Sequence, residues 1–200
     1  MAVGIKRGAV RAPRGEVRII SGAWRSRRIA FPASEGLRPT PDRVRETVFN
    51  WLTPFLPGAA CLDLFAGSGA FGFEALSRGA VRAVLVEKRL EVFAALRHNR
   101  EQLKAEHANI VHADAVEFLR GPAVAFDIVF IDPPYASGLL APCVELLDTR
   151  GWLKPDAFIY LEAPEGETPP LPASWQQVRS KTAGQVGYHL ARRTQNQEAP

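Results

Sequence analysis

The chain has 200 residues, 46% of them apolar, which suffices for one full core, so we expect a single domain with at most a small appendage. The net charge of +4 is uneven: residues 1–50 hold 11 Lys+Arg against 4 Asp+Glu, whereas residues 51–200 hold 14 against 17. No run approaches the roughly 20 apolar residues of a membrane span, and two cysteines indicate neither a disulfide framework nor a metal site. We therefore expect a monomeric cytoplasmic protein that holds no metal. Its basic N-terminal part either binds a polyanion or is a solvated tail.

The N-terminal quarter predicts an arm followed by a small extension. Residues 1–15 are rich in Gly, Pro and Arg without periodicity, which is typical of a flexible arm. The extension, residues 16–55, has two β-prone runs around Ser21-Gly22, as in a hairpin or a pair of edge strands. A helix follows, for which Thr40 can cap and Pro41 suits the first helical position. Its apolar stripe is Val44, Val48, Trp51 and Leu52.

From residue 60 onward, short apolar runs alternate with amphipathic segments. This order predicts an α/β domain over residues 56–194, in which a mostly parallel sheet carries helices on both faces. A hairpin around Ala183-Gly184 would add antiparallel strands to one edge, and residues 195–200 form a tail. We expect strands near 60–64, 82–87, 109–112, 126–131 and 157–162, and helices near 70–78, 89–103, 114–120 and 138–148.

A glycine pattern follows the first strand of this domain. Gly67, Gly69 and Gly72 form G-x-G-x-x-G at the opening of a helix. Glycines there permit a tight turn and let the backbone approach a ligand closely. The pattern alone is weak, because dinucleotide enzymes share it, and a Gly-rich turn without a ligand is the alternative.

Carboxylates after the strands narrow the choice of ligand. Asp63, four residues before Gly67, would repel a pyrophosphate but attract a positive amino group. Glu87 ends the second strand and can accept hydrogen bonds from ribose hydroxyls. Together they fit S-adenosylmethionine (AdoMet), which has an amino acid at one end, a ribose in the middle and no phosphate. Asp114 suits an adenine amino group, although it would equally well cap the helix beginning at Ala115.

Asp132-Pro133-Pro134-Tyr135 follows the apolar run at 126–131. A carboxylate and a backbone carbonyl, each accepting one hydrogen of an exocyclic amine, can aim the nitrogen lone pair at an electrophilic methyl group. Asp132 and the Pro133 carbonyl would be these acceptors, while the two prolines donate nothing that competes. Tyr135 can stack on the base. The stretch predicts a catalytic socket for an amino-bearing planar ring; the alternative is a proline turn with a packed tyrosine.

Four stretches resemble, in the same order, the bacterial small-subunit (16S) rRNA (guanine-N2)-methyltransferase family of the RsmD type: RIISGAWRSRRIAFP, LRPTPDRVRETVFNWL, CLDLFAGSGAFGFEALSRGA and DIVFIDPPY. The resemblance extends from about Val17 to Arg193. It implies a Rossmann-like class I AdoMet-dependent methyltransferase with a seven-stranded sheet and a small basic hairpin and helix extension. It also implies methyl transfer to the N2 amine of a guanine in small-subunit rRNA, within a ribosomal particle.

The resemblance also assigns roles to the motifs. The socket at 132–135 would hold the target guanine, and Arg38 and Thr40 are candidates for the methionine end of AdoMet, with Arg45 or Glu46 nearby. The alternative is that Thr40 and Arg45 only cap and solvate a helix. The residues expected to contact the cofactor in the remaining motifs are Asp63, Gly67, Ser68, Gly69, Glu87, Asp114 and Ala115.

The basic extension suits an RNA substrate. Trp24 and Phe31 could stack on a base or fill the hairpin core, and packing is favoured for Trp24. A base inside folded RNA must be splayed out to reach the socket. The arginines that could contact phosphates are Arg18, Arg25, Arg27 and Arg28.

Two other functions remain open from the sequence. One is a DNA adenine-N6 methyltransferase, although no insertion is large enough for the additional target-recognition region that such enzymes usually need. The other is a catalytically inactive RNA-binding or ribosome-assembly module, which intact motifs disfavour.

Overall fold

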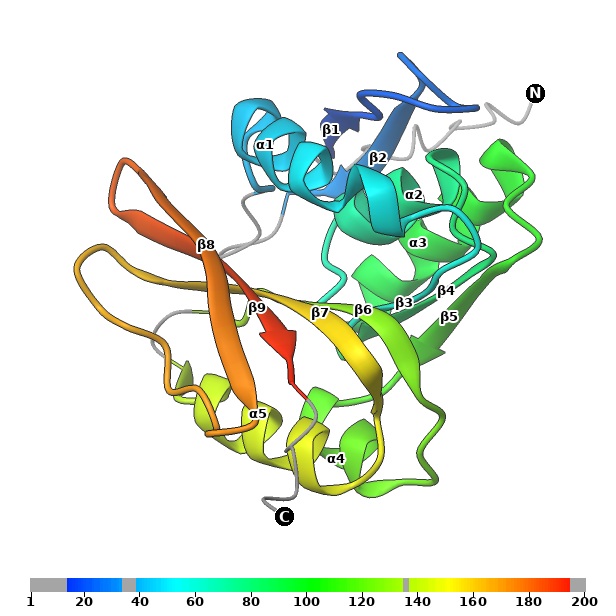
Figure 1. The fold of residues 1–200 in the computed structure, drawn as a ribbon. Coiled ribbons are helices and arrows are strands. Elements are labelled where there is room, and N and C mark those ends of the chain that lie inside the picture. The colour runs from blue at the N-terminus through cyan, green and yellow to red at the C-terminus, as the bar shows by residue number, and fades with distance from the viewer. Residues whose placement is uncertain (1–13, 34–38, 135–136, 195–200) are drawn as a thin grey trace, which may run out of the picture.

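The computed structural model describes residues 14–33, 39–134 and 137–194, and shows a large sheet with helices on both faces (Figure 1). The large sheet has seven strands in the order β5-β4-β3-β6-β7-β9-β8, and β1 and β2 form a separate antiparallel pair. The strands are β1 (Arg14–Arg18), β2 (Arg28–Pro32), β3 (Ala60–Asp63), β4 (Arg82–Glu87), β5 (Ala108–His112), β6 (Phe126–Ile131), β7 (Leu153–Pro164), β8 (Trp175–Ala183) and β9 (Val186–Arg193). The helices are α1 (Asp42–Leu52), a 3-10 turn η1 (Thr53–Phe55), α2 (Ala70–Ser77), α3 (Leu90–Leu103), α4 (Ala115–Arg120) and α5 (Leu140–Thr149).

The alternation predicted from residue 60 onward is confirmed. Neighbouring strands from β5 to β7 are parallel, and β9 and β8 extend the sheet as an antiparallel hairpin. The largest difference in a strand boundary is in β7, which begins at Leu153 and not near 157. A register shift between Phe126 and Ile128 lets Leu153 pair with Phe126 before the regular ladder resumes.

The strand order contains a topological switch point between β3 and β6. From β3 the chain moves outward to β4 and β5 and then returns to place β6 on the other side of β3. Asp63, the last residue of β3, pairs with Phe130 of β6, and the Leu64 N–H donates to the Phe130 carbonyl at 3.1 Å. The loops that follow β3 and β6 therefore leave the same sheet edge side by side, where open α/β sheets bind ligands.

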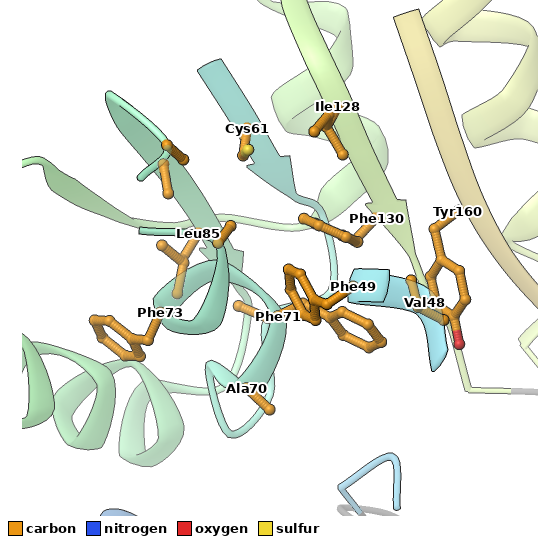
Figure 2. Close-up of a cluster of buried hydrophobic side chains, with 14 of the residues drawn as sticks. Val48, Phe49, Cys61, Ala70, Phe71, Phe73, Leu85, Ile128, Phe130 and Tyr160 are labelled. Atoms are coloured by element: carbon orange, nitrogen blue, oxygen red, sulfur yellow. The ribbon is translucent and has the colours of Figure 1, made fainter. Parts of the chain in front are cut away.

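Different elements cover the two faces of the sheet. The pair β1–β2 lies with α1, α2 and α3 on one face, and α4 and α5 cover the other (Figure 1). In β6, Phe130 faces the first hydrophobic cluster and Val129 the second. Figure 2 shows the first cluster, where the rings of Phe49, Phe71 and Phe130 lie with centroids 5.0 to 5.9 Å apart. These rings fix α1 and α2 against the end of β6, two residues before Asp132.

Helix α1 differs from its predicted start and apolar stripe. It begins at Asp42 after Pro41, and no side chain caps it, so the prediction that Thr40 caps the helix is wrong. The Thr40 hydroxyl instead points to the sheet edge, where it meets carboxylates. Phe49 is fully buried, whereas Trp51 is only half-buried and stacks on Tyr188 at 5.6 Å.

The predicted hairpin is confirmed and shares the core of the larger domain. Its strands are joined by a loop closed by the Ile19 N–H donating to the Arg27 carbonyl at 2.9 Å. Ile19 and Phe31 belong to the same hydrophobic cluster as Leu85 of β4. A boundary between residues 55 and 56 therefore divides one continuous core. The predicted arm lies outside the described residues except for its last two positions, which belong to β1, and so does most of the predicted tail.

The described residues include neither a membrane-spanning helix nor a cluster of metal-binding side chains. Within them, no helix is long and apolar enough to cross a membrane, and no group of three or more His, Cys, Asp or Glu could hold a metal ion. Cys61 and Cys143 are free and buried. Burial raises the pKa of the Cys143 thiol to about 12, and that of Cys61 further still, so both stay protonated at neutral pH.

Candidate functional site

The loop between β3 and α2 turns tightly on glycines. Gly67 has φ 49° and Gly69, just before α2, has φ 81°, a region that favours glycine. A Cβ on Gly69 would lie 2.7 Å from the Phe73 ring, and one on Gly72 would lie 2.6 Å from Leu85. The third glycine of the motif therefore permits α2 to pack directly on β4.

Asp63 lies beneath this loop. Its Oδ2 accepts a hydrogen bond from the Gly72 N–H at 2.9 Å, and only 3% of the residue is exposed. Burial raises the pKa of this carboxyl to about 7, with the Gly72 hydrogen bond opposing the shift and the charge of Glu87 adding to it. A cation placed beside Asp63 would favour its ionised form.

Glu87 connects the glycine loop to the end of β4. Its Oε2 accepts from the Gly67 N–H at 3.1 Å, and its Oε1 accepts from the Arg89 N–H at 2.8 Å. Each carboxylate oxygen has more than one lone pair, so both bonds are compatible with a ribose hydroxyl as a further donor.

Helix α4, which follows β5, is capped by the side chain of Asp114. Asp114 Oδ1 accepts from the Val116 N–H at 2.9 Å, which confirms the capping alternative, while the adenine contact stays a prediction. Ala115 begins α4 and is buried. Ser68, in the glycine loop, is also buried, at 6% exposure.

The socket begins at Asp132, directly after β6. The structure describes Asp132, the buried Pro133 and the exposed Pro134, whereas Tyr135 lies outside the described residues. The pKa of Asp132 is raised well above its ordinary value, first by burial, then by the charges of Glu162 and Asp63 and by a hydrogen bond with Glu162. Asp132 and the carboxylate beneath the glycine loop are thus electrostatic neighbours.

A threonine and a carboxylate that are far apart in the chain meet at Asp132. Thr40 Oγ1 lies 3.1 Å from Glu162 Oε1 and 3.4 Å from Asp132 Oδ2. Glu162 Oε1 also accepts from the Tyr160 hydroxyl at 2.6 Å, and 5% of Glu162 is exposed. The Thr40 hydroxyl has one hydrogen and can donate it to only one of these carboxylates at a time.

The sequence interpretation missed Glu162 and Tyr160. A signal for Glu162 existed, because it follows the apolar run at 157–161 just as Asp63 and Glu87 follow theirs. An ionisable residue after an apolar strand points to the sheet edge where parallel strands place their ligands.

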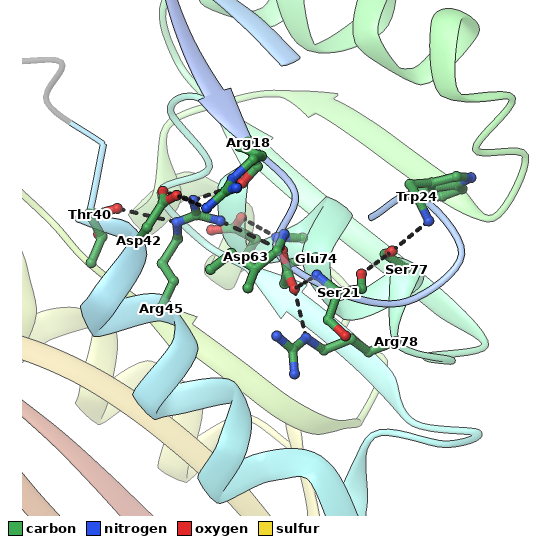
Figure 3. Close-up of polar contacts among 12 residues, drawn as sticks. Arg18, Ser21, Trp24, Thr40, Asp42, Arg45, Asp63, Glu74, Ser77 and Arg78 are labelled. Atoms are coloured by element: carbon green, nitrogen blue, oxygen red, sulfur yellow. Dashed lines mark hydrogen bonds and ion pairs between the residues drawn. The ribbon is translucent and has the colours of Figure 1, made fainter. Parts of the chain in front are cut away.

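Arg45 connects the residues around Thr40 to the end of β1 and to α2 (Figure 3). Its side chain is buried; it donates to the carbonyls of Thr40 at 3.2 Å and Arg18 at 2.8 Å, and it lies 3.7 Å from the buried Glu74 carboxylate. The alternative that Thr40 and Arg45 only cap and solvate a helix is therefore wrong. Glu46 is exposed on α1, and Arg38 lies outside the described residues.

The four arginines proposed for RNA are exposed but differ in their contacts. Arg18 pairs with Asp42 at 3.3 Å and Arg28 pairs with Glu16 at 3.0 Å. Arg27 donates to a carbonyl at the end of α3, while Arg25 lines a surface depression together with Arg18. Trp24 packs against the first hydrophobic cluster and Phe31 belongs to it, which confirms packing for Trp24.

The arrangement favours a ligand with positive charge at one end. Asp63 is influenced by the charge of Glu87, and Asp132 by the charges of Glu162 and Asp63, so anionic groups converge at the switch point. A sulfonium and an amino group would relieve their mutual repulsion. The residues present therefore fit AdoMet, whereas a pyrophosphate would add repulsion.

Comparison with known proteins agrees with this geometry. The family described as conserved hypothetical protein 95 matches residues 17–192. Ribosomal RNA small subunit methyltransferase D of Escherichia coli (strain K12) is 49% identical over 180 residues, covering 90% of this chain and 91% of the relative. The protein of the same name from Haemophilus influenzae is 44% identical over 181 residues, covering 88% and 94%. The chain belongs to the ribosomal RNA small subunit methyltransferase D family.

A solved structure agrees as well. The Escherichia coli protein yhhF has a TM-score of 0.83 and 48% identity, covering 90% of this chain and 99% of that one. As a member of the methyltransferase D family, the chain is an AdoMet-dependent methyltransferase with a Rossmann-like sheet. These matches do not favour the DNA methyltransferase or the inactive module.

Proposed function

We propose that this protein transfers a methyl group from AdoMet to the exocyclic N2 amine of a guanine in small-subunit rRNA, as a cytoplasmic monomer acting on a ribosomal particle. The names of the relatives at 44% and 49% identity support the choice of RNA. The chemistry is supported by one observation, that Asp132 and the glycine loop follow neighbouring parallel strands at one sheet edge. A methyl donor at one loop is then within reach of an amine held at the other.

The cofactor residues are assigned by charge and place. AdoMet supplies an electrophilic methyl group on a positive sulfur. We assign its amino acid end to Asp63 and to the residues around Thr40, its ribose to Glu87 and its adenine to Asp114. Arg38 keeps the assignment made from the sequence. Backbone contacts are assigned to Gly67, Ser68, Gly69 and Ala115.

The target amine is assigned to the socket. Asp132 and the Pro133 carbonyl each accept one hydrogen of N2, and the ring lies beside Pro134 and stacks on Tyr135. As the new N–C bond forms and the S–C bond breaks, the nitrogen becomes positive and its proton passes to Asp132 or to water. Burial and the charge of Glu162 raise the pKa of Asp132, which makes its carboxylate a stronger proton acceptor.

The RNA backbone is assigned to the basic extension, where Arg18, Arg25, Arg27 and Arg28 are exposed. Contacts to phosphates would position the RNA, while the socket selects the base. The target guanine leaves its stack to enter the socket.

The test is labelled methyl transfer to small subunits and to naked rRNA from cells lacking the gene, with duplex DNA as the competing substrate. We expect one methylated guanine, located by mass mapping. Asp132→Ala should abolish transfer while AdoMet binding, measured by calorimetry, persists. Preferential methylation of DNA, or full activity of Asp132→Ala, would overturn the proposal.

A further inference from the structure

A polar depression lies between the hairpin loop, the exposed side of α1 and the end of α2. Its volume is about 370 Å³, within the size range of small-ligand sites. Three arginines line it, one from the end of β1, one from the hairpin loop and one after α2, together with two serines and an asparagine: Arg18, Arg25, Arg78, Ser21, Ser26 and Asn50. Every one of these side chains can donate a hydrogen bond, as an anion requires.

The guanidinium of Arg78 is already held in place. Its Nε donates to the buried Glu74 carboxylate at 2.7 Å, and its Cζ lies 5.0 Å from the centre of the Phe49 ring. Figure 3 shows its two terminal nitrogens directed away from Glu74. Because one edge of the fork is fixed by the protein, the other edge can bind an oxyanion at a reduced cost in side-chain entropy.

The hairpin loop is fixed to α2 as well. The N–H groups of Ile20 and Ser21 donate to the Glu74 carboxylate at 2.7 and 3.0 Å, and the Ala23 N–H donates to the Ser77 carbonyl at 2.7 Å. Gly22 has φ 84°, and a Cβ there would lie 1.8 Å from the Ser77 oxygen. The depression is therefore formed before any ligand arrives.

The depression keeps a positive charge, because the nearby carboxylates of Glu74 and Asp42 are already paired with arginines. Glu74 is fully buried and is paired with Arg45 and Arg78, and Asp42 is paired with Arg45 and Arg18. Among the described residues lining the depression, Glu46 is the one acid against three arginines.

The depression is also connected to the target socket. Arg45 donates to the backbone carbonyls of Arg18, at the depression, and of Thr40, whose hydroxyl lies 3.4 Å from Asp132. The position of the basic loop and the position of the socket are thus fixed by the same buried side chain.

We propose that this depression binds a phosphate of the RNA chain that carries the target guanine. The proposal rests on the proposed function and refines its RNA contacts: Arg25, Arg18 and Arg78 hold the phosphate, whereas Arg27 and Arg28 make contacts elsewhere on the protein. Arg78 follows α2 and was not among the arginines predicted from the sequence. Guanidinium forks bind phosphate oxygens in bidentate fashion, which makes this site one that fixes register and not sequence.

The experiment compares Arg25→Ala with Arg179→Ala in the full chain. Arg25 is exposed at the depression, and Arg179 is exposed on β8, where it donates to the carbonyl of Val178. RNA affinity is measured by fluorescence anisotropy over a range of salt. We expect Arg25→Ala to reduce the slope of log affinity against log salt by about 1, equally for RNAs of different sequence. Arg25→Glu should reduce it at least as much, and Arg179→Ala should leave it unchanged.

Methylation kinetics give a second readout. Arg25→Ala should raise KM for RNA with kcat retained, since the phosphate contact is made before and during transfer. Salt slopes and KM values that match those of Arg179→Ala would overturn the phosphate site while leaving the methyltransferase proposal intact. Absence of RNA methylation by the unaltered protein would instead overturn the proposed function.

Discussion

Thr40 Oγ1 lies 3.1 Å from Glu162 Oε1, within hydrogen-bond distance, although 122 residues separate the two positions in the chain. The contact joins the segment before α1 to the end of β7, and Asp132 lies within 3.4 Å of the same hydroxyl. Glu162 raises the pKa of Asp132 and Thr40 lowers it. The two residues therefore act in opposite directions on the proposed catalytic carboxylate.

The first prediction concerns the pH dependence of methylation. Asp132 must be ionised to accept amine hydrogens, so activity should be lost as pH falls through its raised pKa. Glu162→Gln removes a negative charge and should move this acid limb of kcat to lower pH. Thr40→Val removes a donor to the carboxylate and should move the limb to higher pH. Shifts of the acid limb in the same direction for both variants would contradict this assignment, because that result is what general damage to the site would give.

The second prediction concerns stability and Asp63. Between its ordinary pKa of 3.8 and the raised value of about 7, the folded protein binds a proton that the unfolded chain does not. Stability without ligand should therefore fall as pH rises through this window. Asp63→Asn keeps an acceptor for the Gly72 N–H without the charge, and should be more stable than the unaltered protein above pH 7, by at most about 4 kcal/mol.

Urea unfolding of both proteins at several pH values measures this difference. It should nearly vanish at about pH 4, where Asp63 is protonated in the folded state. A difference that is constant with pH would show that Asp63 does not titrate as inferred. AdoMet should bind Asp63→Asn more weakly, because the partner of its cationic end is lost.

The sequence predicted the alternation of strands and helices from residue 60 onward because each strand is an apolar run of ordinary length bounded by turns or motifs. It also located Asp63, Glu87 and Asp132, since each directly follows or ends such a run. Parallel strands place these ends at one edge, so the topology converts chain positions into a site.

Other features required the tertiary structure. The helical pattern around α1 could not reveal that Arg45 is buried, because its partner Glu74 lies on another helix and hydrophobic periodicity treats charged residues as solvent-facing. Thr40 was predicted as a cap because helix-start preferences are local, whereas its actual partners are 92 and 122 residues away. Arg25 lines the depression, whereas Arg28 pairs with Glu16. A local sequence pattern cannot distinguish these two tertiary environments.

The third prediction concerns the buried pair of Arg45 and Glu74, neither of which is exposed. Arg45→Met removes a charge that stabilises the buried carboxylate, and should cost about 3 kcal/mol, the lower end for breaking a buried pair, because Arg78 remains. Arg43→Met changes an exposed arginine on the same helix and should alter stability by less than about 0.5 kcal/mol. Equal unfolding midpoints in urea for the two variants would show that the buried pair contributes nothing specific.

The last prediction concerns Gly22, which fixes the hairpin loop on α2. Gly22→Ala combines a left-handed backbone with a Cβ 1.8 Å from the Ser77 oxygen. Gly184→Ala is the control, because its φ is 61° but nothing lies within 4 Å of the added carbon. Both variants should lose about 1–2 kcal/mol through backbone strain, and Gly22→Ala a further 1–3 kcal/mol as the loop is forced off α2.

RNA binding distinguishes the two glycines further. Displacing the loop moves Arg25 relative to Arg78, so Gly22→Ala should weaken RNA binding at a temperature where the protein remains folded. AdoMet affinity, which depends on loops at the sheet edge, should change little and serves as the check on folding. Gly184→Ala should retain RNA affinity, because the β8–β9 turn contributes no residue to the depression. Equal RNA affinities for Gly22→Ala and Gly184→Ala would show that holding the hairpin loop on α2 is not what positions Arg25 and Arg78 for RNA binding.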